Sequence, residues 1–355
     1  MERSVSKQYN AVDIAKLIMA LLVVVIHKPL FSSDQVFANY FLGKIIAAVA
    51  VPFFFIASSF FFFRKLDGTK EDNKRFWKFE KRLFILYFAW SVFYFPINLI
   101  KFYGLPISDI TLDNFIVNMK MLLYRFFLSQ TFIHLWYINT LMISVAILFL
   151  LKKKLSSKQT FFVAVVLFLA YKLAPMLFGI LPLAETVWNM IPGVLSNVFG
   201  SEMGSGIFCA GLGMLFCDVN IKKRSTQYIA FLISTAAMIS FSIFAFEKES
   251  IVVETVKFIL VTICAAAIFI FCRNTDLKDS KVYGVLREYS SMIYFSHLFM
   301  TTEFFDSFSK STGIVAFFQI GVLKYSITLL ASVVFSTIII LLSRKKPFKW
   351  LKYLY

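Results

Sequence analysis

The sequence predicts an all-α, polytopic integral membrane protein with about ten transmembrane helices and both termini in the cytoplasm. The composition gives the first reason. Hydrophobic residues make up 59% of the 355 positions and charged residues only 16%, too few to cover a water-soluble surface. The mean hydropathy is +0.76. The second reason is the pattern, because the apolar residues occur in long runs and the basic residues gather between alternate runs.

The apolar runs are near the length of about 20 residues that crosses the hydrocarbon core of a bilayer. They lie at 11–31, 41–63, 83–102, 132–151, 160–181, 203–217, 226–246, 251–272, 289–306 and 315–343. The sixth and ninth are short, and the tenth is long enough to tilt. We treat residues 1–355 as a single transmembrane domain, with a basic cytoplasmic loop at 64–82 between the second and third spans.

Basic residues set the expected orientation. Most of the 37 Lys and Arg residues fall on one side of the membrane if the N-terminus is cytoplasmic, as the positive-inside rule requires. This bias explains the net charge of +17. We therefore expect the lipid bilayer as a partner and no nucleic acid. Segments 103–131 and 182–202 then lie outside. We expect these aromatic-rich segments to rest in the interface or to fold back as a re-entrant lid.

The first span, "AVDIAKLIMALLVVVIH" at 11–27, carries three ionisable side chains. Asp13 and Lys16 are three residues apart and share a helix face. His27 follows fourteen residues after Asp13 and returns to nearly the same face, about 21 Å along the helix at 1.5 Å per residue. Because intramembrane ionisable groups are costly, this stripe predicts a functional site. The structural alternative is an interfacial ion pair with a hydrogen-bonded histidine.

The other two histidines of the chain also lie in or beside predicted spans. His134 occurs in "FIHLWYINTLM", where His134 and Trp136 fit either an aromatic belt or a substrate site. His297 occurs in "SSMIYFSHLFM", three residues after Tyr294. The second pair fits either a buried hydrogen bond or part of a cavity.

The basic loop at 64–82 has two interpretations. Lys78, Lys81 and Arg82 are spaced i, i+3, i+4, so one helical face would present three cations to a polyanion such as a nucleotide, with Arg75 one turn earlier. Anchoring to anionic lipid is the alternative.

Two further motifs predict packing rather than chemistry. The four cysteines form no CxxC pair and have no histidine at ligand spacing, so no metal site is expected. The glycine-rich stretch "GSGIFCAGLG" at 204–213 follows no strand and lies in an apolar run. It therefore predicts close helix packing rather than a phosphate-binding loop.

Several stretches together resemble the membrane acyltransferase-3 family. In chain order they are "VDIAKLIMALLVVVIH" (12–27), "GKIIAAVAVPFFFIASSFFFFRK" (43–65), "HLWYINTLMI" (134–143), "GIFCAGLGMLF" (206–216) and "YSSMIYFSHLFM" (289–300). The N-terminal part is most similar to a subgroup, the membrane domain of vancomycin-resistance serine racemases.

The resemblance implies an acyltransferase in the bacterial plasma membrane. It would move an acyl group, expected to be acetyl, from cytoplasmic acyl-CoA to a hydroxyl of a cell-surface glycan or related acceptor, without a metal. His27 would be the essential histidine and would act with Asp13. The cations expected to contact CoA are Lys16, Arg75, Lys78, Lys81 and Arg82. The side chains expected to contact the acceptor are His134, Trp136, Tyr294 and His297.

A transporter is the alternative function. The membrane half of the serine racemases is thought to admit serine, so the polar stripe of the first span would then line a translocation path for serine or another small solute. The sequence continues only briefly after the last predicted span, so we expect no racemase domain and no Lys-bound pyridoxal phosphate.

Overall fold

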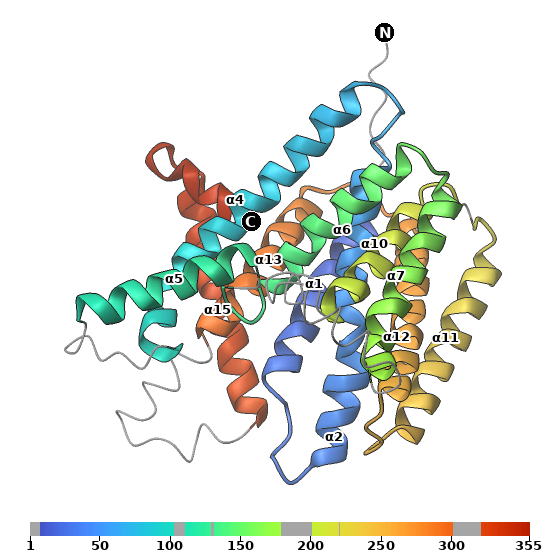
Figure 1. Cartoon of the computed structure of the whole chain (residues 1–355), viewed down its shortest axis with the longest axis horizontal. Helices are drawn as coiled ribbons and strands as arrows, with labels where there is room; N and C mark the ends of the chain where they lie inside the picture. Colours follow the sequence, from blue (N-terminus) through green and yellow to red (C-terminus); the bar gives the residue numbers. More distant parts are fainter. Residues whose placement is uncertain (1–7, 103–110, 129–130, 179–200, 220, 301–320) are drawn as a thin grey trace.

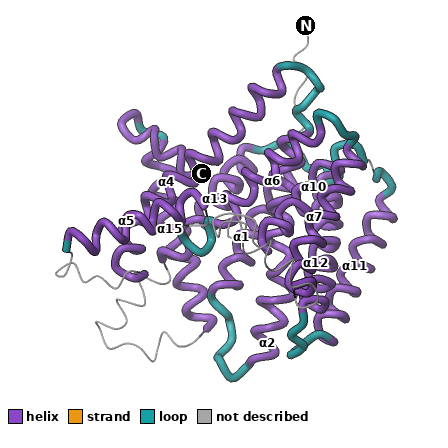
Figure 2. The backbone as a smooth tube through the Cα atoms, in the orientation of Figure 1, coloured by secondary structure: helices purple, strands orange, loops and turns teal. Residues whose placement is uncertain are grey.

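A computed structural model describes residues 8–102, 111–128, 131–178, 201–219, 221–300 and 321–355. Within these ranges all regular elements are helices and no strand occurs, as Figure 2 shows. The predicted all-α class is therefore confirmed. The predicted outer segments at 103–131 and 182–202 fall partly outside the described residues, so the interfacial or re-entrant placement stays a prediction.

The helices follow one another along the chain as shown in Figure 1. They are α1 (Asn10–His27), α2 (Val36–Tyr40), α3 (Ala50–Phe63), α4 (Glu71–Phe102), α5 (Leu112–Leu128), α6 (Trp136–Lys152), α7 (Ser157–Phe178), α10 (Ser201–Leu215), α11 (Arg224–Phe244), α12 (Ile251–Arg273), α13 (Lys281–Leu298) and α15 (Gly321–Ser343). A π-helical turn, η1 (Phe41–Ile46), and a 3₁₀ turn, η2 (Ala47–Val49), join α2 to α3 in one continuous run. The 3₁₀ segment η6 (Lys346–Leu354) follows α15.

Five of the described helices are long and apolar enough to cross a membrane. They are Asn10–His27, Val36–Phe63, Arg224–Phe244, Ile251–Arg273 and Gly321–Ser343. Trp136–Lys152 and Glu202–Leu215 are apolar but shorter. Three of the predicted spans, at 160–181, 289–306 and 315–343, extend into residues outside the description. The count of ten spans and the cytoplasmic termini therefore stay predictions.

The glycine-rich stretch of α10 allows this helix to pack closely between its neighbours. A Cβ atom at Gly206 would lie 2.2 Å from Cγ2 of Thr140 on α6, and one at Gly213 would lie 2.2 Å from the carbonyl oxygen of Ile56 on α3. Both distances are shorter than any real contact, so no larger residue fits without displacing a neighbour. The prediction of close helix packing at 204–213 is confirmed.

The basic segment predicted as a loop at 64–82 is helical from Glu71 onward. Asp72 lies in the first turn of α4, and its carboxylate accepts the backbone N–H of Gly68 at 2.8 Å, which closes a short turn before the helix. Gly68 has φ +81°, a left-handed conformation that favours glycine. Lys78, Lys81 and Arg82 therefore lie on a helix, as their spacing requires for a shared face.

Helix α1 lies in the middle of the fold, where it packs against α13 and α3 (Figure 1). Its residue Asp13 contacts α13 near the N-terminal ends of both helices, and its last residue, His27, meets His297 near the other end of α13. The two helices therefore run parallel and side by side. This pairing positions the candidate site.

Candidate functional site

The N-terminal end of the α1–α13 pair is held by an ion pair between the buried carboxylate of Asp13 and the partly exposed Arg287. Both carboxylate oxygens of Asp13 accept hydrogen bonds from Arg287, one of them from Nε at 2.9 Å. The Lys16 Nζ atom lies 3.8 Å from the same carboxylate, and the Asp13 residue is only 3% exposed. The predicted Asp13–Lys16 pair exists, but Arg287 is the closer partner.

Sequence reasoning missed Arg287 because the residue falls between the predicted spans at 251–272 and 289–306. The structure starts α13 at Lys281. A usable signal was present, since Arg287 precedes His297 by ten residues, almost the eleven-residue spacing between Lys16 and His27. Two parallel helices with these spacings bring cation to carboxylate at one end and histidine to histidine at the other.

At the other end of the pair, the three histidines of the chain come together. The ring centroids of His27 and His297 are 5.2 Å apart, and those of His134 and His297 are 5.7 Å apart. His297 is 0% exposed and His134 is 1% exposed, whereas His27 is half-buried. Residues from α1, the turn before α6 and α13 therefore form one cluster, which we call the histidine cluster (His27, His134 and His297).

Two rings of the histidine cluster keep nitrogen atoms without a hydrogen-bond partner among the described residues. The Nδ1 atom of His297 lies 2.7 Å from the carbonyl oxygen of Tyr294 and 3.2 Å from that of Ile293, while its buried Nε2 atom has no partner. The His134 ring lies near the carbonyl oxygen of Phe295, but neither ring nitrogen forms a hydrogen bond of normal geometry. Buried polar atoms are normally paired, so unpaired nitrogens mark a place for a ligand or water.

Aromatic side chains enclose the histidine cluster. The ring of Tyr94 lies 5.0 Å from His134, and that of Phe132 lies 5.7 Å from it. The hydroxyl of Tyr294 donates to the backbone oxygen of His134 at 3.1 Å, so the predicted residue Tyr294 does lie at the site. Sequence reasoning missed Tyr94 because a tyrosine in a long apolar helix carries no distinctive signal.

The structure separates Trp136 from its neighbour Tyr137. The Trp136 ring contacts Phe55 at 6.0 Å, and no contact joins Trp136 to the three histidine rings in the described part of the chain. Tyr137 instead packs against Tyr294 at 5.6 Å and shares a hydrogen bond of 3.0 Å with Ser58. Tyr137 therefore packs against Tyr294, and the contact of Trp136 with an acceptor stays a prediction.

The cations of α4 fall into two groups. Nη1 of Arg75 lies 2.8 Å from a carboxylate oxygen of Asp67 and 2.8 Å from one of Asp72. Hydrogen bonds from Thr69 and from Arg75 lower the pKa of Asp67 to about 2. Arg75 is thus committed to a local ion-pair network.

The second group consists of the three exposed residues Lys78, Lys81 and Arg82, which form no ion pair with other described residues. Arg82 lies close enough to Lys16 to interact with its charge. This group and the N-terminal end of α1 therefore share one positively charged region. We call Lys16, Lys78, Lys81 and Arg82 the basic mouth.

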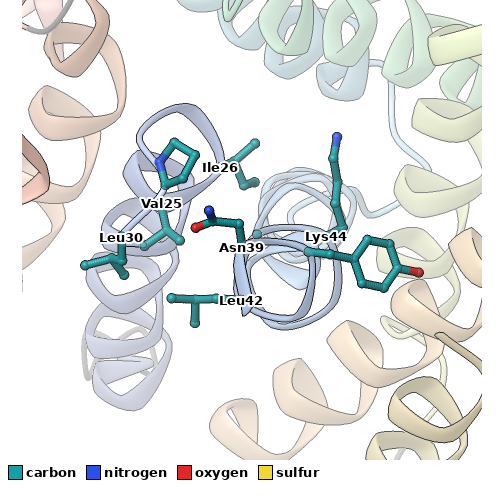
Figure 3. Close-up of a pocket in the computed structure, with 9 residues that line it drawn as sticks. Val25, Ile26, Leu30, Asn39, Leu42 and Lys44 are labelled. Atoms are coloured by element: carbon teal, nitrogen blue, oxygen red, sulfur yellow. The ribbon is translucent and has the colours of Figure 1, made fainter. Parts of the chain in front are cut away.

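A pocket of about 260 Å³ opens between the C-terminal end of α1 and the α2–η1 run, and His27 is not among the residues that line it (Figure 3). Apolar side chains such as Val25, Leu30 and Leu42 line it, and Asn39 lies among them in Figure 3. No group of three or more His, Cys, Asp or Glu side chains within the described ranges is arranged to hold a metal ion.

Comparison with known proteins gives one match over nearly the whole chain. The family model described as an acyltransferase domain matches residues 9–341. The matched region includes both ends of α1 and all of α13, and so contains both the basic mouth and the histidine cluster.

Two curated proteins of Enterococcus faecalis, each named an amino-acid racemase, are similar to part of the chain. One is 30% identical over 228 residues, which is 63% of this chain and 30% of that protein. The other is 24% identical over 275 residues, which is 76% of this chain and 38% of that protein. The chain therefore spans about a third of the length of these relatives. No solved structure matches the chain significantly.

Proposed function

The chain belongs to the acyltransferase domain family, and we propose that it is a membrane O-acyltransferase that uses acyl-CoA, with acetyl-CoA as the first candidate donor. The acceptor would be a hydroxyl of a cell-surface glycan or a related molecule. The observation that carries this proposal is the meeting of His27, His134 and His297 in a largely buried, aromatic-walled cluster. Transfer of an acyl group to a hydroxyl needs a positioned base, and imidazole is the side chain most often used.

In the proposed reaction, His27 is the general base. One ring nitrogen takes the proton of the acceptor hydroxyl while the hydroxyl oxygen attacks the thioester carbonyl carbon. A C–O bond forms and the C–S bond breaks, so the sulfur of CoA leaves with the electron pair and takes the proton from His27. Asp13 does not contact His27, and it serves by holding α1 against α13 through Arg287.

The basic mouth is the proposed site for the phosphates of CoA. Lys78, Lys81 and Arg82 are exposed and free of carboxylate partners among the described residues, and Arg82 approaches Lys16. A cation without a carboxylate partner can bind phosphate oxygens without first breaking an ion pair. Arg75, which already pairs with two carboxylates, contributes less to this site than its sequence position suggested.

The histidine cluster and its aromatic walls form the proposed acceptor site. His134 offers its ring nitrogens to a hydroxyl group, and Tyr294 supports the backbone of His134. With both termini in the cytoplasm of a bacterial plasma membrane, the basic mouth would face the cytoplasm and His27 would lie in the outer half of the membrane. The acyl group would therefore move from the basic mouth to His27 along the α1–α13 pair.

The test is acyl transfer by the purified protein in lipid nanodiscs. Acetyl-CoA labelled in the acetyl group would be supplied with polymers of glucose or N-acetylated amino sugars as acceptors, and with L-serine as a comparison. We expect label to enter a glycan and to depend on His27. Full activity of a His27→Ala variant would exclude the mechanism.

A transporter is a second candidate, and the similarity to two proteins named amino-acid racemases favours an amino acid as its solute. In that case the polar groups of α1 would line a path for serine or another small solute. Uptake of labelled L-serine into proteoliposomes that lack CoA would support transport. Replacement of Lys78, Lys81 and Arg82 would then leave uptake unchanged, because a permease needs no phosphate-binding cations.

A further inference from the structure

The fixed orientation of the His297 ring points to a specific role for its unpaired Nε2 atom. This inference rests on the acyl transfer proposed above. We propose that His297 is a positioning residue for His27, and that Nε2 of His297 accepts the N–H of His27. The remaining nitrogen of His27 is then the base that receives the proton of the acceptor hydroxyl.

The tautomer of His297 follows from its backbone contacts. Nδ1 lies 2.7 Å from the carbonyl oxygen of Tyr294 and 3.2 Å from that of Ile293. Carbonyl oxygens can only accept, so Nδ1 must carry the hydrogen. In the uncharged ring, Nε2 therefore holds a lone pair and can only accept a hydrogen bond.

The surroundings fix this lone pair in place. His297 is 0% exposed, and Nε2 is buried without a partner. The neighbouring rings with hydrogens to donate are His27, at 5.2 Å between centroids, and His134, at 5.7 Å. A buried acceptor in a fixed ring selects the tautomer of the histidine that donates to it, in the way that a carboxylate selects the tautomer of a catalytic histidine.

His27 needs such a partner during the reaction. When it takes the hydroxyl proton, both ring nitrogens carry hydrogens, and the second N–H must be paired. The charged or titratable groups around it in the described part of the chain are Lys28, Lys44 and the other two histidines, and a lysine cannot accept. Asp13 lies about 21 Å along the helix. The ring of His297, 5.2 Å from that of His27 between centroids, carries an unpaired acceptor for this N–H.

His134 provides the matched comparison. Its ring is buried like that of His297, but no carbonyl is hydrogen-bonded to either ring nitrogen with normal geometry. Its tautomer is therefore held less firmly than that of His297. A His134→Phe variant replaces a buried imidazole just as His297→Phe does, but it leaves the proposed His27–His297 contact in place.

Nitrogen NMR on histidine-labelled protein in nanodiscs tests the proposal without any substrate. The chain has only three histidines, so single substitutions assign every signal if the purification tag contains none. We expect His297 to show the Nδ1–H tautomer and His27 to show one tautomer. His297→Phe should turn His27 into a mixture of tautomers, whereas His134→Phe should not, and His297→Gln should restore a single form. Unchanged His27 signals in His297→Phe would overturn the proposal.

Kinetics supply a second test once an acceptor glycan is found. We expect His297→Phe to lower kcat by about 10²- to 10⁴-fold, with KM for acetyl-CoA unchanged, and His297→Gln to recover part of the loss. An equal fall in kcat for His297→Phe and His297→Gln would contradict positioning. If the wild-type protein transfers no acyl group, the proposed function fails, while the NMR result still decides whether His297 orients His27.

Discussion

The two ends of helix α1 differ in how their polar side chains are satisfied. At the N-terminal end, Asp13 is paired with Arg287 and Lys16, and Asn10 donates to Asp279 at 2.8 Å. At the C-terminal end, the rings next to His27 keep unpaired nitrogens. Paired polar groups hold two helices in register, whereas unpaired buried groups are available to a reacting molecule. We call the N-terminal end of α1 its structural end, and the C-terminal end, where we propose the reaction, its chemical end.

The largest effect should come from the chemical end. His27→Ala should lower acyl transfer by about 10²- to 10⁴-fold, the usual contribution of a general base. Thermal stability should change little, because His27 is half-buried and makes no structural ion pair among the described residues. The initial rate of acetyl transfer from labelled acetyl-CoA measures the effect, and the unfolding temperature controls for folding.

The next effect should come from the structural end. Arg287→Ala leaves the buried Asp13 carboxylate with only Lys16 at 3.8 Å, so the free energy of unfolding should fall by about 2–4 kcal/mol. Denaturation in a detergent series measures the loss. Adding Asp13→Asn to Arg287→Ala should restore part of the stability, since no unpaired carboxylate then remains. A double variant that is no more stable than Arg287→Ala would argue against the ion pair.

A smaller effect is expected from the basic mouth. Replacing Lys78, Lys81 and Arg82 together by glutamine should weaken acetyl-CoA binding by about 10- to 30-fold, as expected for exposed phosphate contacts. Lys74→Gln is the matched control, because Lys74 lies on the same helix and is already paired with Glu71 at 2.7 Å. Binding isotherms in nanodiscs measure both. Equal losses in both variants would show a general charge effect rather than a site.

The smallest effect concerns the turn before α4. Hydrogen bonds from Thr69 and Arg75 lower the pKa of Asp67 from 3.8 to about 2, so the folded state favours its carboxylate. This contribution to stability is present above the unfolded value of 3.8 and is lost as the pH falls through about 2. Asp67→Asn should therefore be slightly less stable than wild type near pH 6, and the difference should shrink below pH 4 in melting experiments.

The sequence was sufficient for features that follow from the helical period alone. The shared stripe of Asp13 and His27 follows from 100° per residue, and both residues do contact the same neighbouring helix. The glycine spacing of α10 likewise predicts close packing, which the structure confirms at Gly206 and Gly213.

The sequence was not sufficient to predict which helices pack against each other. Apolar faces of similar composition look alike in the sequence. The matched spacings Lys16–His27 and Arg287–His297 are the signal that pairs His27 with His297, and no comparable spacing indicates that His134 meets His297. The sequence likewise did not indicate which of Trp136 and Tyr137 packs against Tyr294. The two residues are adjacent, and only the rotation of α6 decides which one faces the site.

The central claim is that the donor enters at the structural end of α1 and the acceptor reacts at the chemical end. Acyl transfer in proteoliposomes of one orientation tests this most directly, with labelled acetyl-CoA on one side of the membrane and acceptor glycan on the other. The account predicts labelled glycan only when acetyl-CoA faces the basic mouth and the glycan faces His27. Transfer only when both substrates share one side, or uptake of solute without acetyl-CoA, would contradict it.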